Sequence, residues 1–134
     1  MFIAKREFKR VPVGDNVILK VTGVEFKPQV NPEVITIKYA DNAGATINEQ
    51  FRTSHDVSMS VFRSRFDAIT NNEYADREDF EPRDIINACV GKLVDVKTED
   101  HEYDGKHYTR VKKVNRVISG EATENSVANW GADL

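Results

Sequence analysis

The sequence predicts a mainly β fold, on three observations. Stretches between residues 16 and 52 alternate apolar and polar side chains, which is typical of strands with one buried face. Apolar residues at helical spacing follow between residues 56 and 70. An Asp-Gly pair, Asp104-Gly105, then separates two further alternating stretches. Such a pair between alternating stretches is the strongest short-range signal of a β-hairpin.

Length and composition indicate one globular domain. We expect a domain at residues 1–120 and a flexible C-terminal tail at residues 121–134, because the tail is poor in core-forming side chains. With 40% hydrophobic and 31% charged residues the chain has no apolar run long enough to cross a bilayer, so no membrane partner is expected. The N-terminus becomes charged at once, unlike a secretory signal, and we therefore expect a cytoplasmic protein.

The first expected strand, residues 16–26, changes its alternation phase at Gly23. A phase slip at an interior glycine indicates a bulge that bends the strand, so that it can serve two parts of a curled sheet. Residues 34–40 and 45–52 are the second and third expected strands, joined by a turn at residues 41–44. A bent first strand favours a small barrel.

One helix is expected between the third and fourth strands. Asp56 is its predicted N-cap and the helix runs to about Thr70. Its apolar face holds Val57, Val61, Phe62, Phe66 and Ile69. Residues 71–83 are polar and acidic and predict a loop or a short helical insertion, and residues 84–91 predict a short helical turn that ends at Gly91.

This order of elements, three strands, a helix and two strands, is that of the OB-fold. The OB-fold is a five-stranded Greek-key barrel whose strands and loops bind oligonucleotides or oligosaccharides. Fold order alone does not give function.

The two-residue turn fixes the register of the last two strands, which divides the hairpin into two faces. The predicted cross-strand pairs on one face are Tyr103 with Lys106, His101 with Tyr108, Glu99 with Arg110, and Lys97 with Lys112. This face is aromatic and basic. The opposite face carries Val96, Thr98 and Val111, which suit a core.

Simple pairing would place Lys113 opposite Val96, on the core side of the hairpin. We therefore expect a bulge near Lys112 and Lys113. Such a bulge would also turn Val111, Val114 and Val117 inward.

Aromatic rings beside cations are what sequence-tolerant binding of single-stranded nucleic acid requires. The net charge of −3 does not exclude this function, because every fully charged side chain between residues 106 and 118 is basic. The candidate nucleic-acid-binding residues are Lys20, Lys38, Arg52, Lys97, Tyr103, Lys106, Tyr108, Arg110 and Lys112. As an alternative, the two tyrosines are cross-strand packing partners and the charge clusters are solvated surface. Tyr39 and Phe51 are expected in the core.

The run Val90-Gly91-Lys92, the valines Val94 and Val96, and the hairpin of residues 102–111 followed by an acid-containing tail resemble one known family. They are similar to the OB-fold single-stranded DNA-binding proteins (SSB) of phage replication and recombination modules. The resemblance implies a basic and aromatic face that binds single-stranded DNA during replication or recombination, in the host bacterial cytoplasm if the protein is phage-encoded. It also implies that the last residues recruit replication or recombination proteins.

The tail candidates for partner binding are Trp130, Asp133 and Leu134. Large aromatic side chains are common anchors at interfaces, so Trp130, with Val127 and Leu134, suits a basic, hydrophobic pocket on a partner. The alternative is that the tail folds back over the protein's own basic face or packs as an ordinary terminal segment. The sequence leaves a homodimer open.

No enzymatic motif is present. The chain has no Gly-rich phosphate loop, serine elbow or cysteine-nucleophile arrangement, and its histidines, His55, His101 and His107, lack the spacing of a helical metal pair. We expect no catalytic residue, metal or cofactor, and a buried role for the lone Cys89. The second functional hypothesis is an OB-like protein-interaction module or phage structural adaptor that does not bind nucleic acid.

Overall fold

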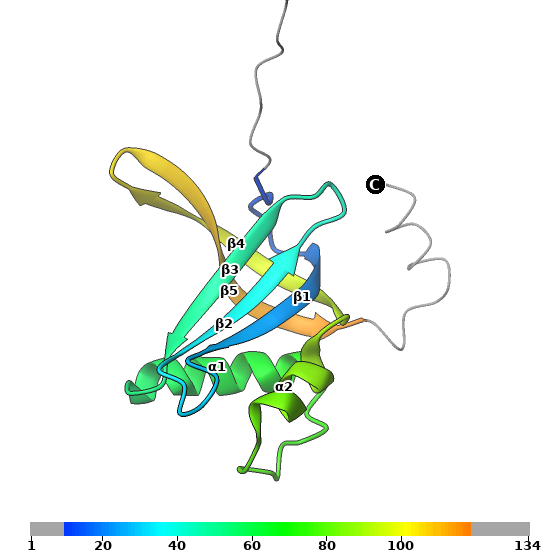
Figure 1. Ribbon diagram of the computed structural model, residues 1–134. Coiled ribbons are helices and arrows are strands. Elements are labelled where there is room, and N and C mark those ends of the chain that lie inside the picture. Colours follow the sequence, from blue (N-terminus) through cyan, green and yellow to red (C-terminus); the bar gives the residue numbers. More distant parts are fainter. Residues whose placement is uncertain (1–9, 119–134) are drawn as a thin grey trace, which may run out of the picture.

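The computed structural model describes residues 10–118 and shows five antiparallel strands in one sheet with two helices (Figure 1). The strand order is β3-β2-β1-β4-β5. The elements are β1 (Val17–Lys27), β2 (Val34–Ala40), β3 (Thr46–Arg52), α1 (Asp56–Ile69), α2 (Pro82–Cys89), β4 (Leu93–Tyr103) and β5 (Lys106–Val117). The mainly β class and the five strands are confirmed. Neither helix of the described part is long and apolar enough to span a membrane.

The expectation of one full helix between β3 and β4 was wrong, but the short helical turn expected at residues 84–91 is confirmed as the second helix, α2. Its start is well defined: Pro82 stands in the first turn, and Glu81 and Asp84 form a capping box. The buried residues of α2 are Ile85 and Cys89. The Cys89 thiol forms no disulfide and is buried, as expected. In α1 the N-cap is His55 rather than Asp56, which lies in the first turn.

The bulge predicted in β1 is present. The pairing of β1 with β2 shifts between Val21 and Gly23, so Thr22 is the extra residue. Before this bulge β1 also pairs with β4, from Val17 to Lys20. After it β1 pairs with β2 alone, and the strand thus serves two parts of the sheet.

The β4–β5 hairpin has the predicted register at its tip: Tyr103 pairs with Lys106, His101 with Tyr108 and Glu99 with Arg110. The predicted pairing of Lys97 with Lys112 was wrong, because Lys97 lies opposite Lys113. The register shifts between Lys97 and Thr98, which leaves Lys112 as the extra residue of a bulge. This confirms the bulge expected there. It buries Val111 and Val114, while Val117 is partly buried against the core.

The core fills the space between the sheet and the helices. Tyr39 and Phe51 are buried as predicted, and the Phe51 ring meets that of Phe62 on α1 edge to face, with centroids 5.3 Å apart. Val57, which we placed on the apolar face of the helix, is 78% exposed. It lies in the first turn of α1, where the helix extends past the core.

Arg65 on α1 is buried and joins the two edge strands of the sheet. Its Nε lies 3.1 Å from both carboxylate oxygens of Glu49 on β3, and its Nη2 donates to the backbone carbonyl of Lys112 on β5 at 2.9 Å. The Tyr39 hydroxyl donates to the same carboxylate at 2.8 Å. Burial raises the pKa of the Glu49 carboxyl, while the Arg65 charge opposes that rise. No strand pairing joins β3 to β5 within residues 10–118, so this side-chain bridge links the two edges.

Replacing Arg65 should therefore destabilise the fold strongly. Arg65→Leu leaves the Glu49 carboxylate and the Lys112 carbonyl without their buried partner, and breaking a buried pair from one side costs about 3–5 kcal/mol. Urea-induced unfolding measures the loss. The matched control is Arg52→Leu, because Arg52 is exposed and makes no ion pair within residues 10–118; its effect should stay within about 0.5 kcal/mol.

The double variant Arg65→Leu/Glu49→Leu should recover part of the loss, since the uncompensated carboxylate is then gone. Equal losses for Arg65→Leu and Arg52→Leu would contradict a bridging role for Arg65.

Candidate nucleic-acid interface

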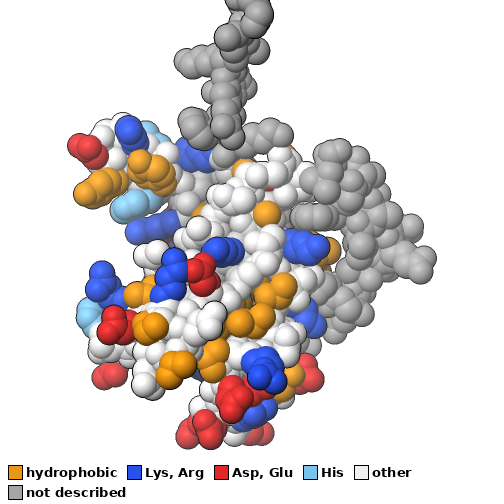
Figure 2. Space-filling model, viewed as in Figure 1, with side chains coloured by type: hydrophobic (Ala, Val, Ile, Leu, Met, Phe, Trp, Pro, Cys, Tyr) orange, Lys and Arg blue, Asp and Glu red, His pale blue; other side chains and the backbone are white. Residues whose placement is uncertain are grey.

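The end of the β4–β5 hairpin projects beyond the rest of the sheet (Figure 1). Asp104 and Gly105 both have positive φ, 53° and 74°, as a type I′ turn requires. Tyr103 and Tyr108, on one face of this hairpin, are 69% and 48% exposed. Figure 2 shows hydrophobic, histidine and Lys or Arg side chains gathered at this end of the molecule, at the upper left, together with an acidic side chain. The structure therefore brings Tyr103, Tyr108 and Lys106 together on an accessible surface.

Part of this positive charge is already neutralised. Arg110 pairs with the carboxylate of Glu99, and Lys112 reaches its other oxygen at 3.4 Å. These two cations hold the pKa of Glu99 below its ordinary value, so its carboxylate stays charged. Lys97 lies 3.6 Å from Asp15. Lys106 makes no ion pair in the described part of the chain.

A hollow of about 780 Å³ lies between the first residues of β5, next to the hairpin turn, and the start of β3. Its lining combines side chains from the N-terminal segment, β3 and β5: Arg10, Val11, Thr46, Ile47, Asn48, Lys106, His107, Tyr108 and Thr109. Three cationic or cationisable groups, three hydroxyl or amide groups and a tyrosine ring thus share one concave surface. Such a surface suits a ligand with a planar ring and an anionic group.

The Asp100 carboxylate contacts two basic side chains on this side of the hairpin. His107 Nδ1 lies 2.8 Å from its carboxylate, and Arg10 pairs with the other oxygen of the same group. His107 and Arg10 both lower the pKa of Asp100. Arg10 Nε also donates to the Thr109 hydroxyl at 2.7 Å, so the guanidinium is fixed beside the hollow.

Arg10, Asn48 and His107 were missed by the sequence analysis. The predicted binding face of the hairpin carries Tyr108, whereas His107 points to the opposite face, because successive side chains of a strand alternate. Arg10 belongs to a visibly basic N-terminal segment, but nothing in the sequence places that segment against residues 100 and 109.

The remaining candidates lie on the outward face of β1, β2 and β3. Lys38 pairs directly with Asn48, a residue of the hollow, and Lys20 is two strands away from Thr46 through Ala40. Both lysines are thus level with the hollow, about 5 and 10 Å from it across the strands. The Lys38 Nζ forms an ion pair with the Glu25 carboxylate at 2.8 Å.

Arg52 does not join this group. It stands at the opposite end of β3 from Thr46, about 20 Å away along the strand. The outward positions on β1–β3 within the described chain carry no aromatic side chain, since Tyr39, Phe26 and Phe51 all point into the core. Ring stacking on this side of the molecule would therefore come from the hairpin tyrosines.

The tail candidates Trp130, Asp133 and Leu134 lie outside the described residues, as does the whole predicted tail. Within residues 10–118 no three His, Cys, Asp or Glu side chains are grouped as a metal site would need.

The geometry thus provides exposed rings and cations around one hollow. The sequence matches no family model and no curated protein.

Proposed function

We propose that this protein binds single-stranded DNA without sequence preference, as a non-catalytic coat of the strand in phage DNA replication or recombination. The observation that carries the proposal is the group formed by Tyr103, Tyr108 and Lys106 at the hairpin end beside the hollow. Aromatic platforms next to a cationic groove are the two elements that such binding uses.

An OB-fold barrel supports this function. The order β3-β2-β1-β4-β5 places β3 and β5 at the two edges, and closing these edges on each other would complete a five-stranded barrel. Arg65 bonds to both edge strands, which favours this closure. In our proposal the barrel presents its β2–β3 surface and the hairpin as one binding face.

The strand would follow the cations and stack on the rings. Lys20 and Lys38 lead along the sheet to Asn48, and Arg10 and Lys106 continue the path at the hollow. Bases would stack on Tyr108 and, further out, on Tyr103. Backbone neutralisation and stacking use groups that every nucleotide has, so little sequence preference is expected.

The most direct test is a fluorescence-polarisation titration of labelled oligo-dT over a range of salt concentrations. Binding should exceed that of a duplex of the same length and should weaken with salt, with a log–log slope of about −0.7 for each phosphate contact. No binding to oligo-dT at low salt would contradict the proposal and favour the alternative, a protein-interaction module or phage structural adaptor.

The tyrosine ring of Tyr108 should contribute directly. Tyr108→Ala should weaken oligo-dT binding by about 1–3 kcal/mol, because a base loses its stacking partner. Tyr108→Phe keeps the ring and serves as the matched control, so it should bind almost as the parent does. If Tyr108→Ala lowers the melting temperature but not the affinity, the tyrosine is a packing residue instead.

Removing the acid that holds two of the cations should have the opposite effect. Glu99→Gln frees Arg110 and Lys112 and removes one negative charge from the hairpin. Oligo-dT affinity at low salt should therefore rise, by about two- to fivefold, and the gain should shrink as salt screens the charges.

Glu33→Gln is the matched control for this variant, because Glu33 is exposed and makes no ion pair in the described residues. The same increase in both variants would mean that only total charge matters. An unchanged affinity in Glu99→Gln would remove Arg110 and Lys112 from the proposed binding face.

A further inference from the structure

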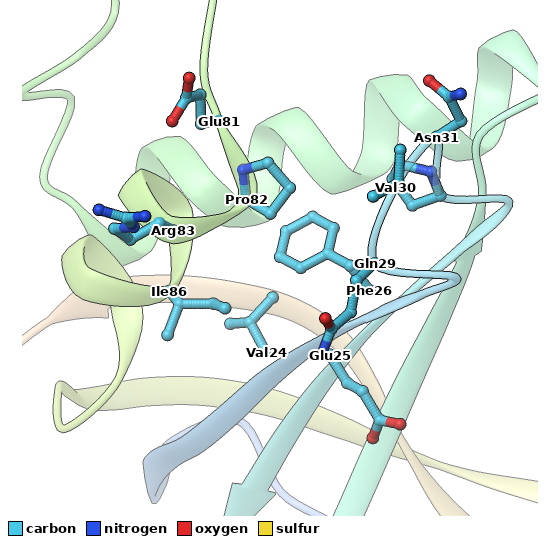
Figure 3. A pocket seen from close by; sticks show the side chains of 11 residues that line it. Val24, Glu25, Phe26, Gln29, Val30, Asn31, Glu81, Pro82, Arg83 and Ile86 are labelled. Carbon is cyan, nitrogen blue, oxygen red and sulfur yellow. The ribbon is translucent and has the colours of Figure 1, made fainter.

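A second, apolar groove of about 820 Å³ lies between the C-terminal half of β1, the loop that follows it and the start of α2 (Figure 3). Its apolar lining consists of Val24, Phe26, Val30, Pro32, Pro82 and Ile86. In Figure 3, Phe26, Pro82, Ile86 and Val24 point toward one another. Val30 in the loop is 75% exposed, so its side chain is available to an occupant of the groove.

Three charged side chains line this groove, and Arg83 is the cation among them. The Glu25 carboxylate is held by Lys27 at 2.9 Å and by Lys38 at 2.8 Å. Glu81 accepts the backbone N–H of Asp84 in the capping box of α2. Arg83, also on the rim, makes no ion pair within residues 10–118. An occupant with bulky apolar side chains and one acid would therefore fit the groove.

The described chain ends close to this groove. The Ile118 N–H donates to the Leu93 carbonyl at 2.8 Å, and Leu93 pairs with Lys20 of β1, so residue 118 lies across β4 from the middle of β1, about 10 Å away. Val24 is about 10 Å further along that strand. Residues 119–127 in extended form span up to about 30 Å. Any residue from 127 onward can thus reach the groove of its own molecule.

Residues 127–134 have the required chemistry. They contain Val127, Trp130 and Leu134 with a single acid, Asp133, and no base. We propose that the groove between β1 and α2 is the docking site of this chain's own residues 127–134, with Trp130 as the apolar anchor and Asp133 as the partner of Arg83. In this proposal, the pocket expected for the tail on a partner lies on the same chain.

The groove is separate from the proposed DNA-binding surface, since the two linings share no residue. Docking in the groove would leave the hairpin and its hollow open. The inference does not depend on DNA binding, and its test contains no DNA.

Trp130 is the only tryptophan, so the fluorescence of the full-length chain reports on it directly. In the parent protein its emission should be blue-shifted and protected from acrylamide quenching. Val30→Asp should shift the emission to that of free N-acetyltryptophanamide and remove the protection. Val57→Asp is the matched control, because Val57 is 78% exposed on α1 and does not line the groove; it should leave the Trp130 signal unchanged.

A charge reversal tests the ion pair separately. Arg83→Glu should weaken the protection, and Arg83→Glu/Asp133→Lys should restore it. Circular dichroism spectra should be the same for all variants, because every substituted side chain in the described part is exposed.

Three results would overturn the proposal. They are a parent Trp130 that is as accessible as N-acetyltryptophanamide, equal effects of Val30→Asp and Val57→Asp, and protection that increases with protein concentration. The last of these would assign the groove to a segment from a second copy.

Discussion

The guanidinium of Arg65 bonds to a side chain of β3 and to the backbone of β5 at once, and the position of these two edges depends on it. Its backbone acceptor is the carbonyl of Lys112, the extra residue of the β5 bulge. An extra residue in a bulge is left out of the strand ladder, and a buried carbonyl without a donor is costly. Arg65 supplies that donor. Glu49 in turn balances the buried positive charge, and Tyr39 adds a hydrogen bond to the same carboxylate.

Because of the same bulge, β5 contributes side chains both to the core and to the outer surface. On the core side, Val111 and Val114 are both buried. They are three residues apart, and regular alternation would place them on opposite faces without the bulge. On the outer side, the Lys112 side chain is exposed and shares Glu99 with Arg110. Arg65 and Glu49 link this part of β5 to β3, and toward the starts of the same two strands Thr46 and Asn48 line one hollow with Lys106 and Tyr108. In our account, the buried bridge shapes the proposed binding surface from the core side, through the backbone of Lys112.

Local patterns predicted the parts of this structure that local interactions determine. The two-residue turn fixes the hairpin register from Tyr103 to Glu99, and Gly23 marks the bulge in β1. The predicted pairing was wrong at Lys97, because the pairing beyond the bulge depends on which residue of β5 is the extra, unpaired one. For α2 the sequence analysis predicted only a short helical turn, although Pro82 and the Glu81–Asp84 capping box signal the start of a helix. Arg10 and Arg65 could not be assigned from the sequence, since their partners lie 90 and 47 positions away along the chain.

The central claim is that one surface, formed by the hairpin and the start of β3, binds single-stranded DNA. Backbone amide chemical shifts, recorded by NMR with and without oligo-dT, test it most directly. We predict that the changes concentrate at residues 46–48 and 101–112, with smaller changes at Lys20 and Lys38. Residues 24–32 and 81–86, which line the apolar groove, should stay unchanged. Saturating oligo-dT that leaves the hairpin amides unmoved, or that shifts the groove residues instead, would contradict the account.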